Sequence, residues 1–170
     1  MNNFEIHIPR FKELPSVPLY KEQVIIYIET LIKNLGIDTG EKILTPTMIN
    51  NYVKQKVVSP PKDKKYNEKH LAYFIVVCVL KQVYSIQEIC QLINLQIATY
   101  PIDVAYDYFC EEFEEALSAV FYTRDFSYLS EVSKNKSEKE MVSSVLMSVC
   151  NKLYIQSKLL EKSTTAEKNE

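Results

Sequence analysis

The stretch "LTPTMINNYVKQKVVSPPKDKKYNEKHLAYF", residues 44–74, predicts two helices separated by a tight, basic break. Thr45 is a good N-cap, and Pro46 suits the first helical position because its missing N–H is not needed there. We expect this helix to span residues 46–56, since the prolines at 60 and 61 cannot continue it. The segment that follows reads as a short strand or extended turn with a basic tip. A second helix then begins after Asn67.

The rest of the chain predicts more helices around this stretch. Only two glycines occur among 170 residues, and 46% of the residues are apolar, which suffices for a core. Ser85 with Glu88 forms a capping box for a further helix. Apolar residues recur at helical spacing in the ranges 19–35, 67–83, 101–122 and 137–160. The predicted fold class is therefore mainly all-α, with long helices at the C-terminal end.

We expect four segments in the chain, with no linker long enough to separate independent domains. These are an extended N-terminal arm (1–18), a compact helical domain (19–98), a helical dimerisation or regulatory part (99–161) and a disordered tail (162–170).

The chemistry of the cysteines and of the N-terminus predicts a cytoplasmic protein. The four cysteines are far apart, lack CxxC spacing and lie in apolar helical contexts, which favours reduced, buried thiols without a metal or cofactor. No apolar run is long enough to span a bilayer, so we expect no membrane association.

Charge is distributed unevenly, although the net charge is only −2. Six lysines against two acids lie between residues 54 and 69, whereas eight acids against one arginine lie between 101 and 131. The first region is suited to contact with a polyanion, and the second would repel one.

We expect the 46–56 helix and the basic turn to form a binding surface for double-stranded DNA. Helical spacing places Thr47, Asn50, Asn51 and Lys54 on one exposed face. Asparagine can bind adenine through two hydrogen bonds, worth about 1–3 kcal/mol of discrimination, and lysines contact phosphates. The candidate DNA-binding residues are Thr47, Asn50, Asn51, Lys54, Lys56, Lys62, Lys64, Lys65 and Tyr66. The alternative is an ordinary solvated surface.

Residues 45–93 resemble the DNA-binding domain of the MerR family of bacterial regulators. "NNYVKQKVVSPP" is similar to that family's recognition helix and turn, "KKY" (64–66) to the end of its wing, and "VYSIQEICQLI" to its last helix. Lys56 stands where the family's turn carries glycine. The resemblance implies a winged helix-turn-helix, with the 46–56 helix as the recognition helix in the major groove and the lysine-tipped wing on phosphates.

"LTPTMINNYVK", "KKYNEKHLAY" and "LKQVYSIQEI" more closely resemble a bacterial family, mostly from Firmicutes, defined as a domain of unknown function. That resemblance covers about residues 20–95, and it implies MerR-like DNA binding in a bacterial cytoplasm.

The C-terminal helices are candidates for pairing with a second copy, as the long helix of MerR-type regulators does. Such a homodimer would address two half-sites one turn of DNA apart. The candidate dimerisation residues are Phe109, Phe113, Val142, Leu146, Val149 and Leu153. The equally open alternative is that these helices complete the core of a single chain.

We do not expect an enzyme, because the sequence contains no GxSxG, P-loop, HExxH or Rossmann glycine pattern. The competing function is a protein-interaction adaptor that keeps the winged architecture without binding DNA. A small apolar effector between the C-terminal helices is also possible, but the sequence does not identify one.

Overall fold

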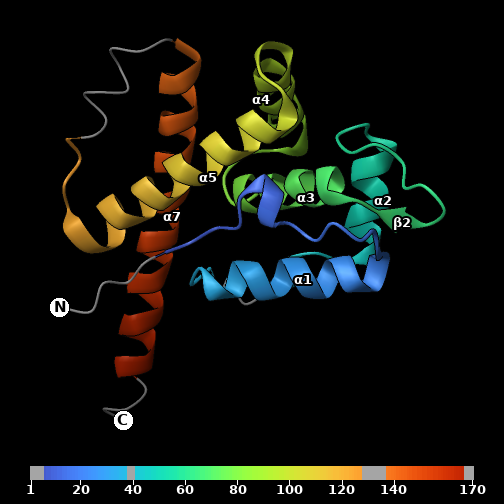
Figure 1. The fold of residues 1–170 in the computed structure, drawn as a ribbon. Coiled ribbons are helices and arrows are strands. Elements are labelled where there is room, and N and C mark those ends of the chain that lie inside the picture. Colours follow the sequence, from blue (N-terminus) through green and yellow to red (C-terminus); the bar gives the residue numbers. More distant parts are fainter. Residues whose placement is uncertain (1–5, 38–40, 128–136, 167–170) are drawn as a thin grey trace. The chain divides into compact units, whose positions relative to one another are not determined.

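The structure is a computed structural model that describes residues 6–37, 41–127 and 137–166. These residues are mainly helical, as predicted, with one short two-stranded sheet (Figure 1). The elements are, in order, the 3-10 turn η1 (Phe11–Glu13), β1 (Leu19–Tyr20), α1 (Lys21–Asn34), α2 (Pro46–Lys54), β2 (Lys65–Tyr66), α3 (Glu68–Leu80), α4 (Ile86–Thr99), α5 (Ile102–Ser118), the π-helical turn η2 (Ala119–Thr123) and α7 (Ser137–Ala166).

Three helix starts follow from local sequence signals. Thr45 Oγ1 accepts the N–H of Met48, 3.2 Å away, and so caps α2, with Pro46 as its first residue. Asn67 caps α3, and Ser85 forms the capping box of α4. Because capping satisfies backbone N–H groups within one turn, these starts could be predicted without knowledge of the fold.

Helix α3 is the centre of the N-terminal unit. It is apolar on nearly every side and is covered by α1, α4 and β2. Its buried side chains are His70, Leu71, Ala72, Phe74, Ile75, Val77, Cys78, Val79 and Leu80. A helix that is hydrophobic all round is stable in water only when other elements surround it, and this requirement organises the unit.

The short sheet joins segments far apart in the sequence. β1 pairs with β2 in antiparallel register, with Leu19 opposite Tyr66 and Tyr20 opposite Lys65. β1 runs directly into α1, so the sheet ties the start of α1 to the segment that precedes α3.

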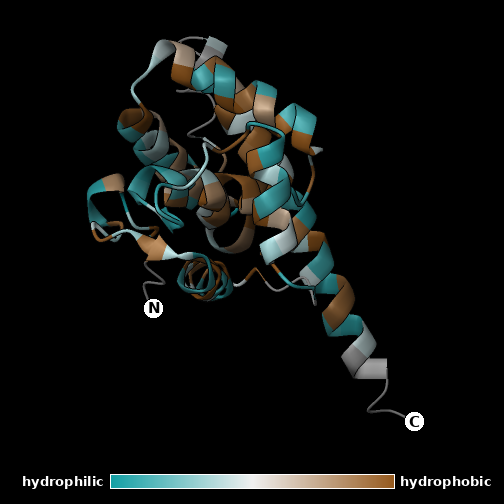
Figure 2. Cartoon of the chain, turned by 90° about the vertical axis from the view of Figure 1, so that its right-hand side faces the viewer, coloured by the Kyte–Doolittle hydropathy of each residue, from teal (hydrophilic) through white to brown (hydrophobic). Residues whose placement is uncertain are grey.

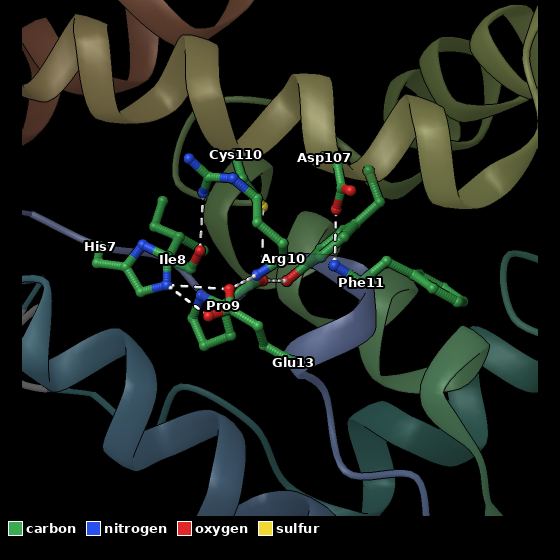
Figure 3. Close-up of polar contacts among 9 residues, drawn as sticks. His7, Ile8, Pro9, Arg10, Phe11, Glu13, Asp107 and Cys110 are labelled. Carbon is green, nitrogen blue, oxygen red and sulfur yellow. Dashed lines mark hydrogen bonds and ion pairs between the residues drawn. The ribbon is translucent and has the colours of Figure 1, made fainter.

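The N-terminal arm is held on α5 by its backbone (Figure 3). The Phe11 N–H donates to Asp107 Oδ1 at 2.6 Å, and the Tyr106 hydroxyl donates to the Pro9 carbonyl at 2.9 Å. Glu13 orders the arm internally by accepting the backbone N–H of Arg10 at 2.6 Å. Ahead of β1, the arm contains only η1 as a regular element within its described residues; residues 1–5 lie outside the described part.

The chain divides into two compact units, and the division falls between residues 111 and 112, inside α5. The contacts of the arm with Tyr106 and Asp107 join the first part of α5 to the N-terminal unit. The four segments expected from the sequence stay a prediction.

The C-terminal unit is built by η2 and α7, together with the end of α5. The ring of Phe121 meets that of Tyr154 edge-on with centroids 5.6 Å apart, and the Arg124 guanidinium lies 4.1 Å from the same Tyr154 ring. Inside the unit, the hydroxyl of Ser143 donates to the buried carboxylate of Glu112. Helix α7 continues to Ala166, past its predicted end at Leu160, and the tail residues 167–170 lie outside the described part.

We predict that Thr45→Ala lowers the free energy of unfolding by about 1 kcal/mol, because the Met48 N–H loses its acceptor. Urea denaturation followed by far-UV circular dichroism measures the change. Thr47→Ala is the matched control, since Thr47 is exposed in the first turn of the same helix. Equal losses in the two variants would contradict the capping role.

Candidate nucleic-acid interface

Helix α2 presents a polar face to solvent. Thr47, Asn50, Asn51 and Lys54 are all exposed, whereas Ile49 and Tyr52 are buried on the opposite side. The four side chains that the sequence placed on one face are thus available to a partner.

A two-residue hairpin forms the basic turn. Lys62 and Lys65 exchange backbone hydrogen bonds of 3.1 and 2.9 Å, and Asp63 and Lys64 between them have φ angles of 50° and 62°. Positive φ at both central residues defines a type I′ turn, whose twist matches that of paired strands. The turn leaves Lys62 and Lys64 exposed and Lys65 half-buried.

Two adjacent residues link this hairpin to α2. The Lys65 ammonium lies 5.0 Å from the centre of the Tyr20 ring, a cation–π contact, and the Lys21 ammonium donates to Asn50 Oδ1 at 2.7 Å. Because Tyr20 and Lys21 are neighbours in the chain, these two contacts join the polar face of α2 to the hairpin. We call these linked residues the basic face; it consists of the exposed residues of α2, the hairpin lysines, Tyr20 and Lys21.

Sequence reasoning missed Tyr20 and Lys21 as members of the basic face. They lie far from the hairpin in sequence, and only the pairing of β1 with β2 brings them there. In the sequence they stand out only as an aromatic residue next to a basic one at the start of α1. Their distance from α2 along the chain does not mark them as partners of that helix.

Tyr66 is not on the basic face, although the sequence assigned it to DNA binding. It is only 2% exposed, and its ring packs 5.4 Å from that of His70 and 5.6 Å from that of Phe74. Successive residues of a strand point to opposite sides, so with Lys65 pointing outward Tyr66 points into the core. Its side chain supports the hairpin rather than contacting a partner.

Lys56, Asp63 and Lys64 have left-handed backbone conformations, with φ between 50° and 62°. This region costs a residue with a side chain about 1–2 kcal/mol, and glycine adopts it without strain. Lys56 follows the C-cap residue of α2, and its exposed charge therefore sits on a strained backbone.

His70 connects the hairpin to the start of α3. The Asn67 N–H donates to its Nδ1 at 3.1 Å, and its Nε2 lies 3.4 Å from the Pro60 carbonyl and 3.2 Å from Ser59 Oγ. A carbonyl only accepts, so Nε2 carries a proton in the contact with Pro60, while Nδ1 also lies 2.6 Å from Asn67 Oδ1. Burial lowers the pKa of His70, which favours the neutral imidazole.

Three of the cysteines, Cys78, Cys110 and Cys150, are buried, and Cys90 is half-buried. All four are free, and burial raises the pKa of the Cys78 thiol to about 12. Within the described ranges, no three His, Cys, Asp or Glu side chains gather as a metal site would require. The described helices also include none long and apolar enough to cross a membrane.

The candidate dimerisation stripe is largely buried within one chain. Phe109, Phe113, Leu146, Val149 and Leu153 are buried, and Val142 is half-buried. Pairing with a second copy through this stripe stays a prediction. Exposed apolar residues occur further along α7, where Ile155 is 57% and Leu159 60% exposed. Figure 2 shows hydrophobic segments continuing towards the end of this helix.

Comparison with known proteins places this helical chain in a family. Residues 9–109 match the family described as "Domain of unknown function (DUF1836)", and because the match covers more than half of the chain, the protein belongs to that family. The matched region runs from Pro9 of the arm into α5 and contains the whole basic face. No curated protein and no solved structure matches the chain.

We predict that Lys64→Gly raises the free energy of unfolding by about 0.5–1 kcal/mol, because relief of the left-handed backbone exceeds the entropy that glycine gains in the unfolded chain. Lys62→Gly removes an equal charge from the same turn at a position without positive φ, so it should lower stability instead. Urea unfolding of both variants tests this, and a fall in stability with Lys64→Gly would disprove the strain.

We predict that the chain loses stability as the pH falls through the ordinary histidine pKa of about 6.5. Since burial lowers the pKa of His70, the unfolded chain takes up its proton first, which favours unfolding. His70→Gln should flatten the dependence between about pH 7.5 and 5.5. An unchanged slope with His70→Gln would assign the loss to other groups.

Proposed function

We propose that this protein is a DNA-binding transcription regulator with a MerR-like winged helix-turn-helix architecture. The observation that carries the proposal is the basic face, where Tyr20 and Lys21 join the polar face of α2 to the hairpin lysines. Amide groups on a short exposed helix beside a projecting basic hairpin are suited to a groove with phosphates at its edge.

In this proposal α2 is the recognition helix. Its exposed residues enter the major groove, and its buried residues Ile49 and Tyr52 fix its position on the core. The hairpin acts as the wing, with Lys62 and Lys64 at phosphates of the neighbouring backbone. No catalytic step and no cofactor are assigned; the proposed activity is binding in a bacterial cytoplasm.

A second copy of the chain completes the proposed regulator. Two recognition helices would then read two half-sites related by the symmetry of the dimer. The stripe first considered for this contact is largely buried in one chain, so the exposed apolar residues Ile155 and Leu159 of α7 are the better candidates. They lie one turn apart on the same helix face.

We expect the full-length protein to enrich a palindromic site from a random pool of double-stranded DNA, with affinity that falls steeply as salt rises. Lys62→Gln and Lys64→Asn should each reduce the slope of log affinity against log salt by about 0.9, because each removes one phosphate contact. Asparagine tolerates the left-handed backbone at position 64, so the fold is kept. Asn51→Ala should alter the selected sequence.

Lys33→Gln is the control for charge, since Lys33 is exposed near the opposite end of α1 from Lys21 and should leave the slope unchanged. Absence of any enriched site, with binding no tighter than to bulk DNA, would reject the regulator. The protein-interaction adaptor would then be the function to test.

A further inference from the structure

The contact between Lys21 and Asn50 fixes the orientation of an amide on the basic face. Lys21 is the first residue of α1, and its ammonium donates to Asn50 Oδ1 at 2.7 Å. An ammonium group has three donors and no acceptor, so the oxygen of the amide must face it. The Asn50 NH₂ group is consequently turned away from Lys21.

Asn51 differs from Asn50 in this respect. Its Oδ1 accepts from Gln55 Nε2 at 3.0 Å, but both partners are amides, and turning both over preserves the hydrogen bond. Asn51 can therefore turn either its oxygen or its NH₂ group towards a partner, whereas Asn50 is oriented with its oxygen at Lys21 and its NH₂ group turned away.

The half-buried Lys21 and the exposed Asn50 together present donors at the surface. The ammonium keeps two further N–H groups, and the amide adds two more. In the major groove, guanine presents two acceptors, O6 and N7, whereas adenine presents the acceptor N7 beside the N6 amino donor. Reading adenine through two hydrogen bonds requires that the oxygen and the NH₂ group of the asparagine both face the base, whereas the contact with Lys21 turns the Asn50 oxygen towards the ammonium.

We propose that Asn50 reads guanine, with Lys21 as the positioning residue that excludes adenine. The inference rests on the proposed function, and it replaces the general expectation that asparagine on this helix selects adenine. Lys21 lies outside α2, so the base preference of the recognition helix is set in part by the start of α1.

The test repeats the selection from random double-stranded DNA with the full-length protein and its Asn50→Ala and Lys21→Met variants. The wild type should recover a guanine at one position of each half-site. Asn50→Ala should lose the preference there, and Lys21→Met, which frees the amide oxygen, should move it towards adenine. Lys33→Met, at an exposed lysine of the same helix, should keep the guanine.

Affinity measurements on the selected site add a readout at the level of one atom. Replacing the guanine by 7-deazaguanine removes the N7 acceptor, so the wild type should bind about tenfold more weakly. Asn50→Ala should bind both sites equally.

The outcomes separate this inference from the function on which it rests. If the wild type enriches no sequence, both are rejected. A wild-type motif that persists in Asn50→Ala and Lys21→Met rejects only the guanine contact. Uniform weakening of all sequences by Asn50→Ala also rejects it, because that pattern indicates a phosphate contact instead.

Discussion

The burial of α3 is the constraint on which the N-terminal unit depends. A helix with apolar residues on nearly every side must be covered all round, and α1, α4 and β2 provide that cover. Once β2 is held against α3 by the Tyr66 ring, the pairing of β2 with β1 determines where α1 begins. The positions of Tyr20 and Lys21 at the surface are thus consequences of core packing.

The same packing decides which side of α2 is exposed. The helix is short: it buries Ile49 and Tyr52 and turns polar residues to solvent on the opposite side. His70 has a similar effect on the hairpin, because its hydrogen bonds to Asn67 and Pro60 anchor both ends of the segment that carries the lysines. The basic face therefore combines an adaptable set of polar side chains with a firmly held backbone.

Sequence reasoning succeeded where the structure depends on neighbours in the chain. The caps of α2, α3 and α4 each involve atoms within one helical turn, and the match to a domain of unknown function agrees with the family type expected from the sequence. It failed where the outcome depends on distant pairing. The inward direction of Tyr66 follows from the register of the sheet, and the link from Lys21 to Asn50 requires two helices to be placed in space. Likewise, the part of α5 that belongs to the N-terminal unit depends on where the arm contacts that helix.

The left-handed lysines bear on how this protein tolerates change. Lys56 and Lys64 occupy backbone positions where glycine is the least strained choice, so the local conformational preference and the surface charge oppose each other. A search for sequences that fold most stably would replace these lysines first and so reduce the positive potential of the surface. In the core, local conformational preference and the fold agree, whereas at these two lysines they conflict, which is a case of local frustration. Selection for stable folding and selection for positive charge therefore act in different directions at these residues.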